Sequence, residues 1–189
     1  LGVDLKKSKI FNKLSQRKHI DWAVSLENVG NHFEYARQGG YWDLMVSNLK
    51  HIQETTTHYI NFQCIFHILS LLKLKDLFNV AEEMGINIEW QIIGDNTLAL
   101  DPLLYEGDIR EKSISILEDV LNTNWSIQYN RDFLLDNLNN LKNNIDINPL
   151  NDVNKNMIEF INNQETLYNT SNHSFHELWP EFDNLFLKK

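Results

Sequence analysis

The chain has 189 residues and a formal net charge of −9, with 26 acidic and 17 basic residues. This charge argues against a protein that wraps nucleic-acid phosphates, because that task requires a clustered excess of Lys and Arg. The single cysteine, Cys64, excludes an internal disulfide framework and a multi-thiolate cluster site within this chain. No apolar run approaches the roughly 20 residues of a bilayer span, so we expect a soluble, cytoplasmic protein with no membrane partner.

Short apolar segments alternate with amphipathic segments over the first half of the chain. The opening Leu-Gly-Val-Asp lacks a signal-peptide pattern and suggests a processed product or a fragment. We predict strands at 20–27, 59–69 and 86–93, and helices at 9–14, 41–53 and 72–84 with Gly85 as a C-cap. Strands and helices in this alternating order, with short connections, indicate an α/β fold with a parallel sheet and right-handed crossovers.

The pattern changes after the third predicted strand, which closes at 94–96. Helices are predicted at 108–122, 133–145 and 157–168, the first of them capped by Asp108. The C-terminal third is rich in Asn, and we expect helices with a solvated Asn-rich face because Leu and Ile recur there. The aromatic residues Trp179, Phe182 and Phe186 predict a tail that docks on the domain. We predict an α/β unit at 1–125 and a helical extension at 126–189.

Polar residues alternate with apolar ones along the three predicted strands. The polar set is Ser25 and Glu27, then Asn61, Gln63 and His67, then Glu89, Gln91 and Asp95. Parallel barrels normally fill such positions with Val, Ile and Leu, and buried polar groups are costly unless they are paired. The row therefore indicates a cavity for a polar ligand or water, and the alternative is a sheet face exposed to solvent. Ser25 and Glu27 stand at the carboxyl end of their strand, where α/β proteins bind ligands.

Other residues that could carry chemistry are isolated in the sequence. His67 could serve as a base or metal ligand, but a lone His in an apolar strand is more often a core residue. No His pair has the spacing of a zinc site, and the GxGxxG, Walker and GxSxG motifs are absent. Arg37 is a candidate anion clamp, with a surface ion pair as the alternative.

Most of the chain resembles radical S-adenosylmethionine enzymes, in the subgroup with a short "twitch" C-terminal extension, and three stretches carry the likeness. In that family a strand V-S-[IL]-[DE]-G precedes a helix with H-x-x-[IA]-R-x-G, and the ending is F-x-E-x-[FW]-P-E. The matching residues are Val24-Ser25-Leu26-Glu27, then Phe33 to Gly39, and Phe175 to Glu181. The family's CxxxCxxC loop and its glycine-rich segment have no counterpart here, and Asn28 stands where the family has Gly.

The resemblance implies strands four to six of a partial (β/α)6 TIM-like barrel, followed by a mostly helical extension. The parent enzyme would cleave S-adenosylmethionine with a [4Fe-4S] cluster to generate a 5′-deoxyadenosyl radical. The cluster ligands would lie outside this chain, which should be inactive alone. The implied partners are the missing N-terminal half of the barrel and a small-molecule or peptide substrate. The implied cofactor-binding residues are Ser25, Glu27, Arg37, Gln63 and Gln91. The alternative is a non-enzymatic α/β interaction module with a solvated polar sheet face.

Overall fold

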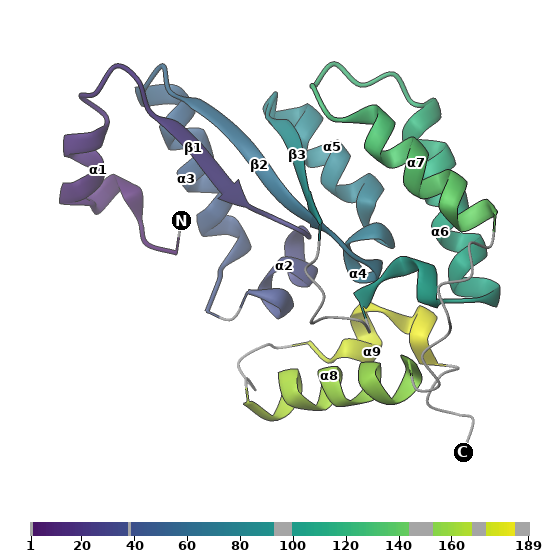
Figure 1. Ribbon diagram of the computed structural model, residues 1–189. Coiled ribbons are helices and arrows are strands. Elements are labelled where there is room, and N and C mark those ends of the chain that lie inside the picture. The colour runs from purple at the N-terminus through teal and green to yellow at the C-terminus, as the bar shows by residue number, and fades with distance from the viewer. Residues whose placement is uncertain (1, 38, 93–99, 144–152, 168–172, 184–189) are drawn as a thin grey trace.

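The computed structural model describes residues 2–37, 39–92, 100–143, 153–167 and 173–183. A three-stranded parallel sheet forms its centre, and helices pack along one face of that sheet (Figure 1). The strands are β1 (Asp21–Ser25), β2 (Tyr59–Phe66) and β3 (Asn87–Ile92), in the order β1-β2-β3. The predicted α/β class, parallel pairing and strand order are therefore confirmed.

Helical crossovers connect the carboxyl end of each strand to the amino end of the next. The elements before and between the strands are η1 (Leu5–Lys7), α1 (Lys9–Leu14), α2 (Gly30–Ala36), α3 (Trp42–Thr55), α4 (Ile68–Leu71) and α5 (Leu74–Met84). Helix α3 ends in the β-branched run Thr55-Thr56-Thr57, which has poor helix propensity. Helix α5 ends at Gly85, whose φ of 63° lies in the left-handed region that favours glycine. The end of α5 at Gly85 is as predicted, whereas α3 extends two residues beyond the predicted end at 53.

The helix-facing side of the sheet forms the main core. Phe62 and Cys64 of β2 are fully buried in one cluster with Leu49 of α3 and Phe78 of α5. Side chains alternate between the two faces of a strand, so the apolar alternates of β2 all turn toward these helices. Burial of each large apolar side chain contributes roughly 1.5–3 kcal/mol, which makes this layer the main source of stability for the sheet.

The C-terminal half is helical in the part that the structure describes. Its elements are η3 (Pro102–Leu104), α6 (Gly107–Asn122), α7 (Arg131–Lys142), α8 (Val153–Leu167), α9 (Phe175–Leu178) and η4 (Pro180–Phe182). Leu134 and Leu138 of α7 belong to the same buried cluster as the sheet, although they follow the boundary predicted at 125.

A second core cluster joins α8, α9 and η4 to the carboxyl ends of the strands. Trp179 and Phe182 are fully buried, as predicted, and Trp179 Nε1 donates a hydrogen bond to Leu69 O at 3.2 Å. In Figure 1 these C-terminal helices lie beneath the sheet, next to α2 and α4. The predicted docking of the tail is confirmed for these residues, whereas Phe186 lies outside the described residues.

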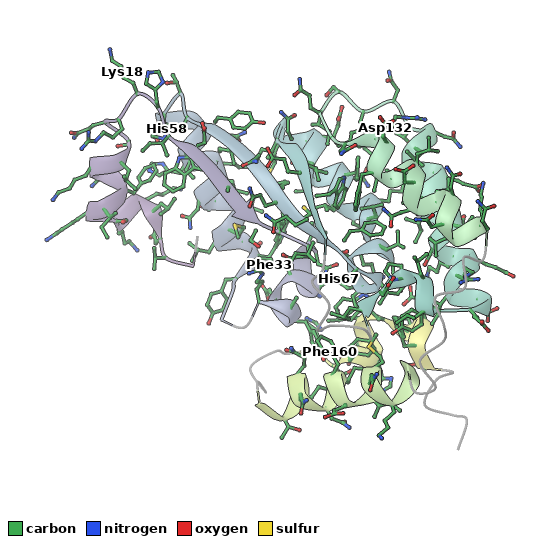
Figure 2. All side chains as sticks on the ribbon, viewed as in Figure 1. Lys18, Phe33, His58, His67, Asp132 and Phe160 are labelled. Atoms are coloured by element: carbon green, nitrogen blue, oxygen red, sulfur yellow. The ribbon has the colours of Figure 1, made fainter. Side chains whose placement is uncertain are left out.

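His67 is an N-cap and does not belong to β2, contrary to the prediction. The strand ends at Phe66, and His67 lies where the chain passes into α4 (Figure 2). His67 Nδ1 accepts from Ser70 N at 3.1 Å, while Ser70 Oγ accepts from His67 N at 3.0 Å. This reciprocal capping box satisfies two backbone donors at the start of α4, which stabilises a helix where the apolar run predicted more strand.

Several other boundaries also differ from the predictions. Helix α6 begins at Gly107 with Glu106 as its N-cap, so Asp108 lies in the first turn, where its charge favours the helix dipole. Helices α7 and α8 begin two and four residues before the predicted positions; Asn130 caps α7 by accepting from Phe133 N at 3.1 Å. Strand β1 ends at Ser25, so Glu27 follows the strand. Asp95 lies outside the described residues.

Candidate functional site

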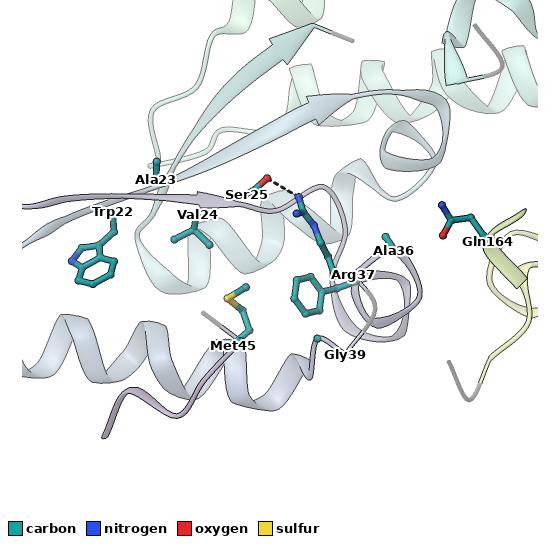
Figure 3. A pocket seen from close by; sticks show the side chains of 12 residues that line it. Trp22, Ala23, Val24, Ser25, Ala36, Arg37, Gly39, Met45 and Gln164 are labelled. Atoms are coloured by element: carbon teal, nitrogen blue, oxygen red, sulfur yellow. Dashed lines mark hydrogen bonds between the residues drawn. The ribbon is translucent and has the colours of Figure 1, made fainter. Parts of the chain in front are cut away.

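Ser25, Glu27 and Arg37 meet at the carboxyl end of β1. Arg37 Nη2 donates to Glu27 Oε1 at 2.7 Å, to Glu27 Oε2 at 2.8 Å and to Ser25 Oγ at 2.6 Å. Arg37 Nε also donates to Glu27 Oε2 at 3.2 Å, and Ser25 Oγ donates to Glu27 Oε1 at 3.2 Å. The close approach of Arg37 to Ser25 is visible in Figure 3. The structure thus brings together three of the five predicted site residues.

The local fold explains why Arg37 returns to this strand end. Arg37 directly follows α2, and its backbone N donates to Phe33 O at 2.8 Å, which closes the last turn of the helix. Gly39 then takes a φ of 71°, a conformation that favours glycine, and the chain turns toward α3. Helix α2 therefore carries the chain from the end of β1 to Arg37, whose guanidinium bonds back to Ser25 and Glu27 at that strand end.

The charges in this cluster are unequally exposed. The Glu27 side chain is 7% exposed and that of Arg37 is 40% exposed. Both Glu27 carboxylate oxygens accept from Arg37, so the carboxylate is already engaged within the protein. The Nη1 group of Arg37 makes no hydrogen bond within the part of the chain that the structure describes. Glu27 therefore orients the guanidinium of Arg37.

Gln63 and Gln91 lie in a second polar group on the sheet face that the helices leave open. The strand register places Ser25 beside Gln63, and Gln63 beside Glu89. Gln91 Nε2 donates to Gln63 Oε1 at 3.0 Å, and Gln63 Nε2 lies 3.5 Å from Glu89 Oε2. Amide and carboxylate groups of β2 and β3 are thus connected by hydrogen bonds, and the strand register places Ser25 of β1 beside them.

A groove of about 730 Å³ runs beside β1 (Figure 3). Of the predicted site residues, Ser25 and Arg37 line this groove. Its wall also includes Phe33, Met45 and, from α8, Gln164. Sequence reasoning missed Gln164 because no local pattern shows that α8 reaches the strand ends; only the docking of the C-terminal helices places it there.

The cysteine and the candidate histidine are unsuited to metal binding in this structure. Cys64 is fully buried, and burial, with the nearby Glu27 charge, raises the pKa of its thiol well above the ordinary value. Burial lowers the pKa of His67 to about 4, and its Nδ1 accepts from Ser70 N. Among the described residues, no three His, Cys, Asp or Glu side chains gather as metal ligands.

Comparison with known proteins identifies no relative. No family model, curated protein or solved structure matches the chain. The site must therefore be interpreted from its own geometry. Within the described ranges, no helix has both the length and the apolar character that crossing a membrane requires.

Proposed function

We propose that this chain is the second half of a (β/α)6 barrel in a radical S-adenosylmethionine enzyme. The observation that carries the proposal is a parallel sheet whose helices cover one face (Figure 1), while the register aligns polar residues on the other face. Parallel sheets are nearly always covered on both faces. A polar face that is enclosed by further strands would line a cavity suited to a polar cofactor.

The polarity of the open face favours a barrel over a doubly wound sheet. Three consecutive parallel strands with crossovers on one face occur in both architectures. In a doubly wound sheet, the second face is covered by more helices and its strands are apolar on both sides. Here that face carries Asn61, Gln63, Glu89 and Gln91, which are the positions that would face the interior of a barrel.

The chemistry of the side chains fits S-adenosylmethionine in part. The guanidinium of Arg37 would pair with the methionyl carboxylate, and Ser25, Gln63 and Gln91 offer donors and acceptors for the amino-acid and ribose groups. The resemblance implies Glu27 as a cofactor-binding residue; in the proposal its geometry makes it a positioning residue that fixes Arg37. When bound, the cofactor and its [4Fe-4S] cluster would supply hydrogen-atom abstraction from the substrate.

The decisive experiment uses the in-frame coding sequence upstream of Leu1. We expect a CxxxCxxC motif there, and the extended enzyme, reconstituted anaerobically with iron and sulfide and then reduced, should form 5′-deoxyadenosine from S-adenosylmethionine. The 189-residue chain should form none. An upstream sequence without the motif, or a cluster-containing enzyme that forms no 5′-deoxyadenosine, would contradict the proposal.

Two variants of the extended enzyme test the residue assignments. Glu27→Gln should weaken S-adenosylmethionine binding by ~1–3 kcal/mol, since it loses the charge that holds Arg37, while iron content stays the same. Arg37→Met should weaken binding at least as much. Arg17→Met, which removes a positive charge from the exposed loop before β1, is the matched control. Unchanged affinity in both site variants would exclude this end of β1 as the cofactor site.

A non-enzymatic interaction module is the second candidate, and the exposure of the open face favours it. Ser25, Glu89 and Gln91 are exposed, and Tyr59 is 46% exposed. Such a module would bind a partner through this face and would show no dependence on S-adenosylmethionine. Calorimetric titration of the extended protein with the cofactor separates the two candidates.

A further inference from the structure

The outer edge of β1 is unpaired in the described part of the chain. Leu26 N donates to Gln63 O at 3.1 Å. Alternate residues of a parallel strand direct their backbone groups toward the same neighbour, so this bond shows which residues of β1 face β2. The backbone groups of Trp22 and Val24 therefore face β2, and those of Ala23 and Ser25 point to the outer edge. No backbone hydrogen bond among the described residues uses those outward groups.

The opposite edge of the sheet is partly covered. Ile88 N donates to Gln128 O at 3.0 Å, and Ile88 forms a parallel bridge with Tyr129. Asn87 Oδ1 also accepts from Gln128 N at 2.8 Å. Exposed strand edges are normally protected in this way because they invite pairing with other chains. Among the described residues, the outer edge of β1 has no comparable cover.

The groove beside β1 has the shape that an added strand requires. Trp22 to Ser25 all line it, and consecutive residues of a strand point to opposite faces, so the groove follows the edge of the sheet. Phe33 and Met45 give it an apolar wall. Gly2 and Gly39 also line it, and a Cβ at either position would meet no atom within 4 Å, which leaves room for another backbone.

The N-terminal segment leads directly into this groove. The Asn48 side chain on α3 accepts from Leu5 N at 3.0 Å and donates to Val3 O at 2.7 Å, which holds Gly2 at the groove. Figure 1 places this end of the chain beside β1 and α3. The stretch 3–20, which includes α1, is about as long as the crossover at 67–86. It therefore exceeds the roughly dozen residues that a connection between parallel strands needs.

We infer that a fourth strand, parallel to β1, fills the groove and hydrogen-bonds to the outward backbone groups of Ala23 and Ser25. It joins the chain at Gly2, so that α1 becomes the crossover helix of another βαβ unit. The pairing follows from the edge geometry alone, while its source in the missing barrel half rests on the proposed function. The side chains of this strand that face α3 pack against Phe33 and Met45.

Amide hydrogen exchange measured by NMR tests the pairing. The probe is the chain extended by the residues encoded directly upstream of Leu1, compared with the 189-residue chain. Protection of the Ala23 and Ser25 amides should rise about 100-fold or more on extension, because they gain partners. The Trp22 and Val24 amides, which face β2, should be protected in both chains. Unchanged exchange at Ala23 and Ser25 would overturn the inference.

A proline variant supplies the matched test. Ala23→Pro removes an outward donor and leaves the inner ladder to β2 intact, so it should abolish the gained protection at Ser25 in the extended chain. Ala23→Thr keeps the donor and should retain the protection. If Ser25 stays protected in Ala23→Pro, no strand occupies this edge.

The inference and the proposed function can fail separately. Protected outward amides in an extended chain without CxxxCxxC would support the strand and exclude the enzyme. Unprotected amides in an extended chain that forms 5′-deoxyadenosine would exclude the strand and support the enzyme. Concentration-dependent protection in the 189-residue chain would assign the groove to a second copy and overturn the inference.

Discussion

The Glu27–Arg37 pair shows how one residue can act through another. Glu27 lies just beyond a strand end and is almost fully buried, and its four hydrogen bonds from Ser25 and Arg37 satisfy its carboxylate. A buried charge retains its stabilising effect only while its partner remains. The pair therefore stabilises the end of β1 and holds the guanidinium of Arg37 in a fixed orientation.

Removal of one partner should destabilise the protein. We expect Arg37→Met to lower the free energy of unfolding by about 2 kcal/mol, less than for a fully buried pair because Arg37 is partly solvated. Urea denaturation at pH 7 measures this change. The double variant Glu27→Gln/Arg37→Met should lose less than the sum of the two single variants. Strict additivity would mean that the pair contributes no coupling.

His67 makes stability depend on pH. Burial lowers its pKa to about 4 from 6.5, so the unfolded chain binds this proton more readily than the folded chain. The contribution of neutral His67 is complete above about pH 6.5 and is lost as the pH falls toward 4. The free energy of unfolding should therefore decrease between pH 7 and pH 5.

The variant His67→Asn isolates this effect. Asn can cap α4 by accepting from Ser70 N and does not titrate in this range. Its free energy of unfolding should vary less between pH 7 and pH 5 than that of the parent chain. Some dependence should remain because burial also lowers the pKa of His32. Equal slopes in the two proteins would contradict the assignment.

At the scale of elements, the C-terminal helices are attached by aromatic packing. Trp179 lies 5.2 Å from Phe175 and 5.5 Å from Tyr35, measured between ring centroids, and it also donates to Leu69 O. His32 Nε2 lies 2.9 Å from Leu178 O, which joins α2 to α9. Helix α9 has only four residues and cannot be stable alone, so these contacts hold it in place.

Trp179→Ala should therefore release the tail. We expect a loss of about 3–5 kcal/mol in the free energy of unfolding, the usual cost of such a truncation in a core. Urea denaturation gives the size of the change, and limited proteolysis after residue 167 shows whether the tail detaches. Tyr41→Ala removes an aromatic side chain that is 67% exposed and should change stability by less than about 0.5 kcal/mol.

At the scale of the molecule, the open edge of β1 makes the isolated chain prone to association. Unpaired backbone groups along an edge strand can pair with another chain. Gel filtration of the 189-residue chain over a range of concentrations should show dimers or larger species. A monomer at high concentration would indicate that the edge is protected by another means.

Local patterns determined much of the fold. Alternation of apolar residues located all three strands, helical spacing located α3 and α5, and Gly85 marked a helix end because few other residues adopt its backbone conformation. The same alternation placed Ser25, Gln63 and Gln91 on one sheet face. These properties depend on neighbours within about ten residues, so the sequence alone was sufficient for them.

Tertiary structure decided what those patterns left open. It turned Glu27 toward Arg37 because α2 carries Arg37 back to the strand end. It also brought Gln164 from α8 into the groove wall. Each of these contacts joins side chains whose meeting depends on how whole elements pack. Residue spacing gives the direction of a side chain from its own strand or helix, but not which distant group it will meet.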